Sequence, residues 1–295
     1  MGTGSSDESG TTVRVSGVEL VLSRPIDLSF SWIGQDDPME QLLAAWSVID
    51  AADFPLSPRL VGQPGSGKTT LACAAARALG REVYLFQVTM DTRPEDLIVT
   101  PVIGAGNSIR YMASSIVSAM LRGGILVLDE GNRMSERSWA SLVPLLDKRR
   151  YVESIVAGVR IHAHPDFRFV TTMNEDSSTF DLPEYIHSRL QPRIHVDFPS
   201  AEDELRILKA ELPYTEDQIL THVVETLQGA HARDLLWSVR DGINVGRYAA
   251  KLMARGLSRD DALSKAKRYI LDERDGLDSD PTFDGDPDKG RDGLE

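Results

Sequence analysis

The sequence has little cysteine, no long apolar run and no excess of basic residues, and each shortage excludes a class of protein. Cys73 is the single cysteine among 295 residues, so a disulfide framework is excluded. No apolar run is long enough to span a bilayer, and the N-terminus does not resemble a signal peptide. The 45 acidic and 32 basic residues give a formal net charge of −13, which disfavours broad nonspecific binding to nucleic acid. We therefore expect a soluble, cytoplasmic protein, with nucleic acid disfavoured as a partner although a local basic strip stays possible.

The most informative segment is GQPGSGKT at residues 62–69, which fits the phosphate-binding pattern G-x-x-x-x-G-K-[ST]. Glycine suits this loop because it adopts left-handed dihedrals without a Cβ clash, so main-chain N–H groups can surround a phosphate. Lys68 is expected to reach the β- and γ-phosphates, and Thr69 to bind Mg²⁺. The alternative is a glycine-rich turn without a ligand, but strand residues before the loop and an Ala-rich helix at 69–79 favour the phosphate site. The predicted contacts are Gly62, Pro64, Gly65, Ser66, Gly67, Lys68, Thr69 and Thr70.

Two carboxylates follow the most apolar predicted strand, in GGILVLDE at residues 123–130. Asp129 lies at the carboxyl end of that strand, where open α/β sheets bind ligands, and is predicted to hold Mg²⁺. Glu130 is predicted to polarise the water that attacks in hydrolysis. A strand that simply ends in two solvated acids is the alternative, and the position about sixty residues after the phosphate loop favours the catalytic interpretation.

Three further polar residues are candidates for catalysis. Asn174 ends the next apolar strand and is predicted to orient the water or contact the γ-phosphate, although asparagine is also common in turns at strand ends. Arg189 and Arg193 follow a predicted helix, and an arginine supplied to a neighbouring active site stabilises phosphoryl transfer. An ordinary surface arginine is the alternative, and for Arg193 the two interpretations carry equal weight.

Alternating apolar strands and helices up to residue 199 predict a parallel sheet covered on both faces. Predicted elements include a strand pair at 13–30, helices at 36–52 and 135–147, a strand pair at 91–112 and a hairpin at 149–163. Residues 200–274 contain only predicted helices and are interpreted as a small α-domain, which begins where Pro199 and Ser200 precede acidic residues. The polar segments 1–12 and 275–295 are predicted to be disordered.

Together these motifs resemble the AAA+ ATPases and, within them, the MoxR family. Residues 32–43, WIGQDDPMEQLL, resemble the N-terminal box that contacts adenine, which implies contacts from Ile33 and Gly34. DEGNR at 129–133 resembles the DE-x-NR of MoxR proteins, whereas HSRLQPR at 187–193 departs from their usual LDRF-like segment. The resemblance implies sensor 1 at Asn174, an arginine finger at Arg189 and sensor 2 at Arg247, which is predicted to open a helix. The segment GRYAAKLMARGLSRDDAL also resembles the related activators of Rubisco and of nitric oxide reductase.

The resemblance implies ATP and Mg²⁺ as cofactors, a hexameric ring, and remodelling of a protein partner that often carries a von Willebrand factor A domain. Two other functions stay open at this point. A nucleic-acid translocase or restriction-type NTPase is disfavoured by the acidic composition, and a metal-chelatase motor subunit belongs to the same branch of AAA+ proteins. The phosphate loop alone does not distinguish ATP from GTP.

Overall fold

The computed structural model describes residues 11–27, 32–175, 182–233 and 235–275 of the chain. The segments predicted to be disordered fall almost entirely outside these ranges. The described residues divide into two compact units, with the boundary between Arg206 and Ile207, and each unit is described by itself. No helix in the described ranges is long and apolar enough to cross a membrane.

The first unit is built on a five-stranded sheet in the order β11-β3-β10-β7-β4. Every neighbouring pair in this sheet is parallel. The carboxyl ends of the strands therefore lie at one edge, where the predicted phosphate loop, Glu130 and Asn174 stand at the ends of three of them. The strands are β3 (Arg59–Gly62), β4 (Val83–Gln87), β7 (Ile125–Asp129), β10 (Arg168–Asn174) and β11 (Arg193–His195).

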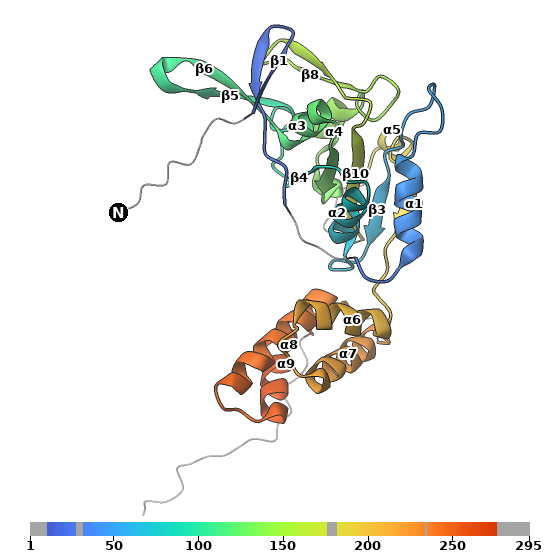
Figure 1. Ribbon diagram of the computed structural model, residues 1–295, viewed down its shortest axis with the longest axis vertical. Coiled ribbons are helices and arrows are strands. Elements are labelled where there is room, and N and C mark those ends of the chain that lie inside the picture. Colours follow the sequence, from blue (N-terminus) through green and yellow to red (C-terminus); the bar gives the residue numbers. More distant parts are fainter. Residues whose placement is uncertain (1–10, 28–31, 176–181, 234, 276–295) are drawn as a thin grey trace, which may run out of the picture. The chain divides into compact units, whose positions relative to one another are not determined.

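Helices cover both faces of this sheet. Successive side chains of a strand point to opposite faces, so an apolar strand presents apolar side chains on both faces, and each face is buried by helices. Along β7, Ile125 and Val127 pack in the apolar cluster of α1 (Asp36–Trp46) and α2 (Lys68–Ala78). Leu126 and Leu128 pack instead in the cluster of α3 (Ser115–Arg122) and α4 (Glu136–Leu142). Figure 1 shows the sheet between these two layers. The predicted α/β sandwich is confirmed.

Two insertions extend from the same unit. β5 (Val99–Ile103) and β6 (Ile109–Ala113) form a hairpin that projects from the domain (Figure 1). β8 (Tyr151–Ser154) and β9 (Val159–His162) form a second hairpin. Both hairpins were predicted. The sequence did not predict that the N-terminal hairpin of β1 (Thr12–Val15) and β2 (Val18–Val21) joins the first of them through parallel pairing of β2 with β6.

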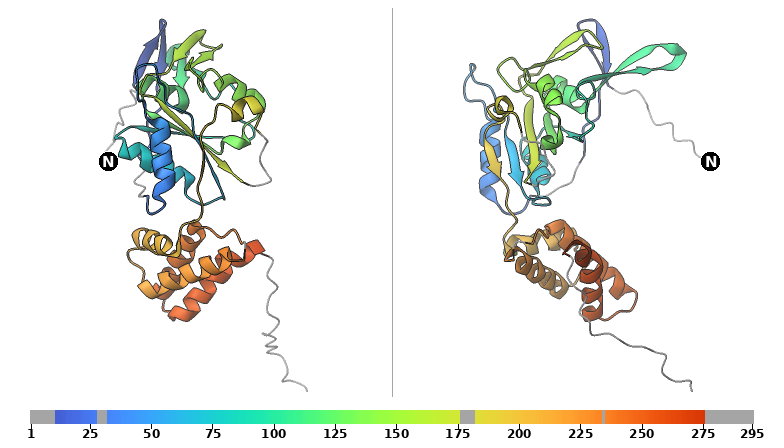
Figure 2. Two further views of the ribbon diagram at one scale, coloured as in Figure 1. Left: turned by 90° about the vertical axis from the view of Figure 1, so that its right-hand side faces the viewer. Right: turned by 180° about the vertical axis from the view of Figure 1, so that it is seen from behind.

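The second unit is helical, as Figure 2 shows. The short α5 (Glu184–His187) precedes β11 in the first unit. After β11, α6 (Ala201–Glu211) leads into the second unit, and α7 (Asp217–His231), α8 (Val239–Ala254) and α9 (Arg259–Asp275) follow. Gly246 of α8 lets Leu212 approach so closely that a Cβ would lie 2.8 Å from its Cδ1. Buried apolar residues of its core are Leu208, Ile219, Leu220, Val223, Leu227, Val245, Ala249, Ala262 and Ala266.

Two predicted helices are shorter than expected. The helix predicted at 36–52 ends at Trp46, and Ile49 is 90% exposed instead of packing at helical spacing. The carboxylates of Asp50 and Asp53 accept bonds from the main-chain N–H groups of Ala52 and Ile49, which stabilises a turn in place of a helix. The helix predicted at 135–147 ends at Leu142, because Pro144 has no N–H to continue the ladder.

The prediction that Arg247 opens a helix is wrong. α8 begins eight residues earlier, at Val239. Ser238 caps it by accepting from the main-chain N–H of Asp241, whose carboxylate accepts in return from the N–H of Ser238. This reciprocal capping fixes the start of the helix, so Arg247 lies well inside α8.

Candidate functional site

The predicted phosphate loop joins the end of β3 to the start of α2. Gly67 precedes the helix with a left-handed φ of 96°, and a Cβ there would lie 3.2 Å from the ring of Trp32. A side chain here would be strained by the backbone conformation, and the ring of Trp32 would have to shift by a few tenths of an ångström. Ser66 is 3% exposed, and its hydroxyl has no hydrogen-bond partner among the residues that the structure describes. Main-chain N–H groups at the start of a helix are suited to bind an anionic phosphate, and the hydroxyl of Ser66 is placed to donate a further hydrogen bond to it.

Lys68 lies folded back along this loop. Its ammonium donates to the main-chain carbonyls of Gly62, at 2.9 Å, and Gln63, at 2.8 Å. The residue is 6% exposed, so its charge is held inside the loop by carbonyl oxygens. A phosphate is a stronger partner for an ammonium than a carbonyl.

Asp129 links the loop to the centre of the sheet. Its Oδ1 accepts from the hydroxyl of Thr69 at 2.7 Å and from the hydroxyl of Thr172 at 2.6 Å. The two residues predicted to bind Mg²⁺ are thus in direct contact, and both offer the oxygen ligands that this ion prefers. The sequence analysis missed Thr172. It belongs to no motif of fixed spacing, so the sequence carried no signal for it.

Glu130 and Asn174 meet at the ends of adjacent strands. The amide nitrogen of Asn174 lies 3.4 Å from Oε1 of Glu130. Glu130 has a left-handed backbone, with φ 58° and ψ 42°, and its N–H donates to the hydroxyl of Thr172 at 2.9 Å. A non-glycine residue in this conformation is uncommon and must be held by its surroundings. The arrangement brings a carboxylate acceptor and an amide donor to one point beside the predicted metal ligands.

The two candidate arginines lie in different surroundings. Arg189 follows α5, donates to the carbonyl of Tyr185 at 2.6 Å and lies 3.5 Å from Asp147. Hydrogen bonds from Arg149, helped by Arg189, lower the pKa of Asp147 to about 2. Arg193, on the edge strand β11, is paired with Glu175 at 2.6 Å. Arg189 is the less exposed of the two, at 28% of its side chain against 54%.

The predicted base contacts, Ile33 and Gly34, are partly buried and lie between Trp32 and Gln35. The indole of Trp32 donates to the carbonyl of Gln35 at 3.3 Å, and the Gln35 amide donates to the carbonyl of Asp197 at 3.0 Å. The first bond closes the segment on itself, and the second ties it to the chain that follows β11. Arg247 belongs to the second unit, so its predicted role in sensing nucleotide stays a prediction.

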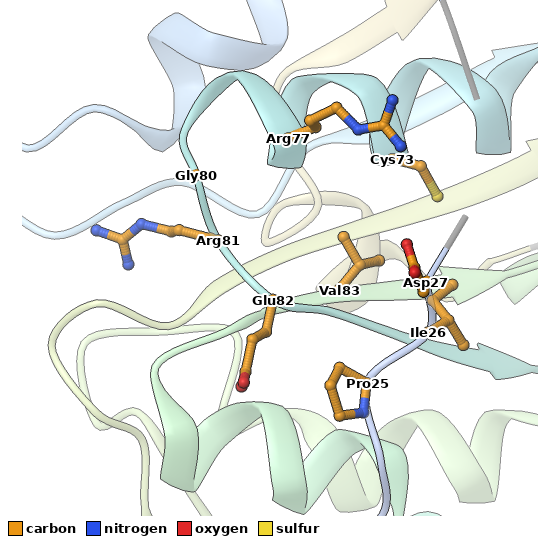
Figure 3. Close-up of a pocket in the computed structure, with 9 residues that line it drawn as sticks. All are labelled: Pro25, Ile26, Asp27, Cys73, Arg77, Gly80, Arg81, Glu82 and Val83. Carbon is orange, nitrogen blue, oxygen red and sulfur yellow. The ribbon is translucent and has the colours of Figure 1, made fainter. Parts of the chain in front are cut away.

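A separate cavity of about 320 Å³ lies at the opposite end of α2 from the loop (Figure 3). Its walls come from α2, from the start of β4 and from the segment Pro25, Ile26 and Asp27. Cys73 lines it, and burial, together with the charge of Asp129, raises the pKa of this thiol to about 11. A thiol with so high a pKa is an inert packing residue, as the sequence analysis expected.

Comparison with known proteins identifies relatives of this arrangement. Residues 59–190 match the family model described as an AAA domain of the dynein-related subfamily. Protein MoxR of Paracoccus denitrificans is 28% identical over 198 residues, which cover 66% of this chain and 57% of MoxR. YeaC of Bacillus subtilis, an uncharacterized protein, is 26% identical over 185 residues, covering 62% of this chain and 53% of YeaC. The match thus spans little more than half the length of these relatives.

Solved structures of similar fold include RuvB of Thermotoga maritima. A mutant form matches with a TM-score of 0.59 at 18% identity, covering 84% of this chain and 74% of RuvB. RuvB described as a Holliday junction branch migration motor matches with a TM-score of 0.55 at 19% identity, covering 80% and 70%. At these identities the likeness concerns the fold alone.

Proposed function

We infer that this chain, a MoxR-like protein built on an AAA domain of the dynein-related subfamily, hydrolyses ATP with Mg²⁺ to remodel or activate a protein partner. The observation that carries the proposal is the convergence of Thr69 and Asp129 beside Glu130 and Asn174. Four residues from three separate segments meet where parallel strands end, and each has the chemistry that phosphoryl transfer to water requires.

Each of these residues has a distinct part in the proposed reaction. Lys68 exchanges its carbonyl partners for phosphate oxygens, and the main chain of the loop donates to the same phosphates. Thr69 and Asp129 would hold Mg²⁺, which neutralises charge on the phosphates when bound. Glu130 accepts a proton from the attacking water while the Asn174 amide donates to that water and orients it.

We further propose that active molecules are rings, in which Arg189 completes the site of a neighbouring subunit. An arginine supplied in this way stabilises the negative charge that develops on the transferred phosphoryl group. Arg189 is held by Tyr185 and Asp147 but keeps 28% of its side chain exposed, which suits a residue that must meet another molecule. Arg193 is the second candidate and would first have to leave Glu175.

The partner is proposed to bind the two hairpins that project from the rigid sheet. Exposed apolar side chains lie near the turn of the first, at Ile103 and Ile109, and in the turn of the second, at Ile155. Exposed apolar residues on projecting loops are typical of protein contact sites. A partner carrying a von Willebrand factor A domain, as the family resemblance implies, is the first candidate to test.

Nucleotide binding is the first test of this function. Titration of ATP and of GTP, with and without Mg²⁺, should give saturable binding in the wild type, and Lys68→Ala should abolish it because the ammonium that meets the phosphates is gone. Arg77→Ala, a charge change at the other end of α2, is the matched control. No binding of either nucleotide to the folded wild type would overturn the proposal. A shift of DNA or RNA at low salt would instead favour a nucleic-acid motor.

A further inference from the structure

Asn132 and Arg133 follow Glu130 in the sequence and were left without a role. They lie in the 3-10 turn η2 (Gly131–Arg133), between the carboxyl ends of β7 and β10. The turn packs tightly on β10, since a Cβ on Gly131 would collide with the hydroxyl of Thr171. The carbonyl of Gly131 accepts from the buried indole of Trp139 at 3.2 Å. A turn fixed in this way can position the side chains that project from it.

Arg133 contacts the proposed base. Its Nε lies 2.8 Å from Oε2 of Glu130 in an ion pair without hydrogen-bond geometry, and both side chains are about one-third exposed, at 31% and 32%. The other carboxylate oxygen of Glu130, Oε1, faces the amide of Asn174 at 3.4 Å. The two oxygens of Glu130 therefore have different partners, and the carboxylate cannot rotate freely without losing one of them.

Asn132 contacts the other residue of the pair. Its amide nitrogen donates to the main-chain carbonyl of Asn174 at 2.8 Å, and the residue is 7% exposed. This bond anchors the end of β10, from which the Asn174 side chain extends toward Glu130. One short turn thus contacts both catalytic candidates, one through its carboxylate and the other through its main chain.

We propose that Asn132 and Arg133 are positioning residues: Arg133 holds Oε2 of Glu130 and Asn132 holds the main chain of Asn174, so that Oε1 and the Asn174 amide face one water. The inference rests on the proposed hydrolysis. A water at that point would donate to Oε1 and accept from the amide, which is the orientation that proton removal requires. Misplacement of a reacting group by about 1 Å can cost roughly a hundredfold in rate.

Steady-state hydrolysis by Arg133→Ala tests this role. We expect kcat to fall about ten- to a hundredfold, while KM and nucleotide affinity change less than about threefold, because Arg133 contacts Glu130 and not the loop. Arg133→Lys should recover part of the loss, since an ammonium keeps the charge but not the fork of the guanidinium. Arg137→Ala removes an equal charge from the exposed side of α4 and should leave kcat unchanged.

A double-mutant cycle separates positioning from a merely structural role. If Arg133 acts through Glu130, then adding Arg133→Ala to Glu130→Gln should not lower the residual kcat further. Additive losses, or an unchanged or raised kcat in Arg133→Ala with an unchanged melting temperature, would overturn the inference. Should Arg133→Ala fail to fold, Arg133→Lys and Asn132→Asp provide the same comparison. Full turnover in Glu130→Gln alone would instead remove the proposed function.

Discussion

The hydroxyl of Thr69 donates to Oδ1 of Asp129 at 2.7 Å, although 60 positions separate the two residues in the chain. The contact exists because β7 lies beside β10, which lies beside β3, so the start of α2 and the end of β7 meet at the same edge of the sheet. Thr172, on the strand between them, donates to the same oxygen. This cluster of oxygens joins the phosphate loop to the residues proposed to act on water.

Without the Thr69 hydroxyl, added Mg²⁺ should no longer accelerate hydrolysis. Thr69→Ala is expected to lower turnover at saturating Mg²⁺ by about a hundredfold or more. This is the rate loss typical of removing one group that stabilises charge in the transition state. Thr69→Ser keeps the hydroxyl and is the matched control. The measurement is the ATPase rate against Mg²⁺ concentration, and an identical curve for Thr69→Ala and the wild type would remove Thr69 from the metal site.

The proposed nucleotide site illustrates which parts of the structure can be predicted from a sequence. Lys68, Thr69, Asp129 and Glu130 belong to short motifs with fixed spacing, so their positions followed from local pattern and the expected strand order. Thr172, whose hydroxyl accepts the N–H of Glu130 and donates to Asp129, belongs to no such motif. Its contacts depend on the parallel register of β10 with β7, which no local pattern specifies.

The same reasoning explains the errors in the fold. Helix ends depend on competing local bonds, and the turn at Asp50 and Asp53 ended α1 earlier than apolar spacing indicated. The pairing of β2 with β6 joins segments about ninety residues apart. Such long-range contacts are set by tertiary packing, whereas a buried strand such as β7 can be predicted from its apolar composition alone.

The proposed ring predicts that Arg189 acts on a neighbouring subunit. Arg189→Ala should keep nucleotide affinity within a few-fold while turnover falls by roughly a thousandfold or more. Binding should be measured by fluorescent nucleotide and turnover by phosphate release. Arg193→Ala, which breaks the pair with Glu175, is the comparison that tells which arginine acts as the finger.

A mixing experiment sharpens that test. Lys68→Ala subunits keep an intact Arg189, and Arg189→Ala subunits keep an intact nucleotide site. Some interfaces in mixed assemblies therefore combine both intact parts, and partial turnover should return. If the subunits are shown to mix and no turnover returns at any ratio, Arg189 does not act across an interface.

The projecting hairpin should couple hydrolysis to the partner without taking part in it. Ile103 and Ile109 are cross-strand neighbours, 76% and 66% exposed. Replacing both with serine should leave basal hydrolysis within about twofold, because they lie outside the proposed nucleotide site, but should abolish stimulation by a partner. Ile49→Ser, at another highly exposed isoleucine, is the matched control. Undiminished stimulation in the double variant would exclude this hairpin as the contact.

Cys73 should resist alkylation in the folded protein. Its pKa is raised from 9.0 to about 11, first by burial and then by the charge of Asp129, so at pH 8 its thiolate fraction is about a hundredfold below that of an ordinary thiol. The folded chain holds this proton to higher pH than the unfolded chain, so the contribution of this group to stability is lost as pH rises from 9 to 11. Rapid labelling by iodoacetamide at pH 8 without unfolding would contradict this environment.

The most direct test of hydrolysis at this site measures ATP binding and ATP turnover separately in Glu130→Gln. The substitution preserves size and leaves the loop, Thr69 and Asp129 in place, but it removes the group that accepts the proton of the water. We predict that the variant binds ATP within a few-fold of the wild type and hydrolyses it at least about a hundredfold more slowly. Wild-type turnover in Glu130→Gln, with binding intact, would contradict the account.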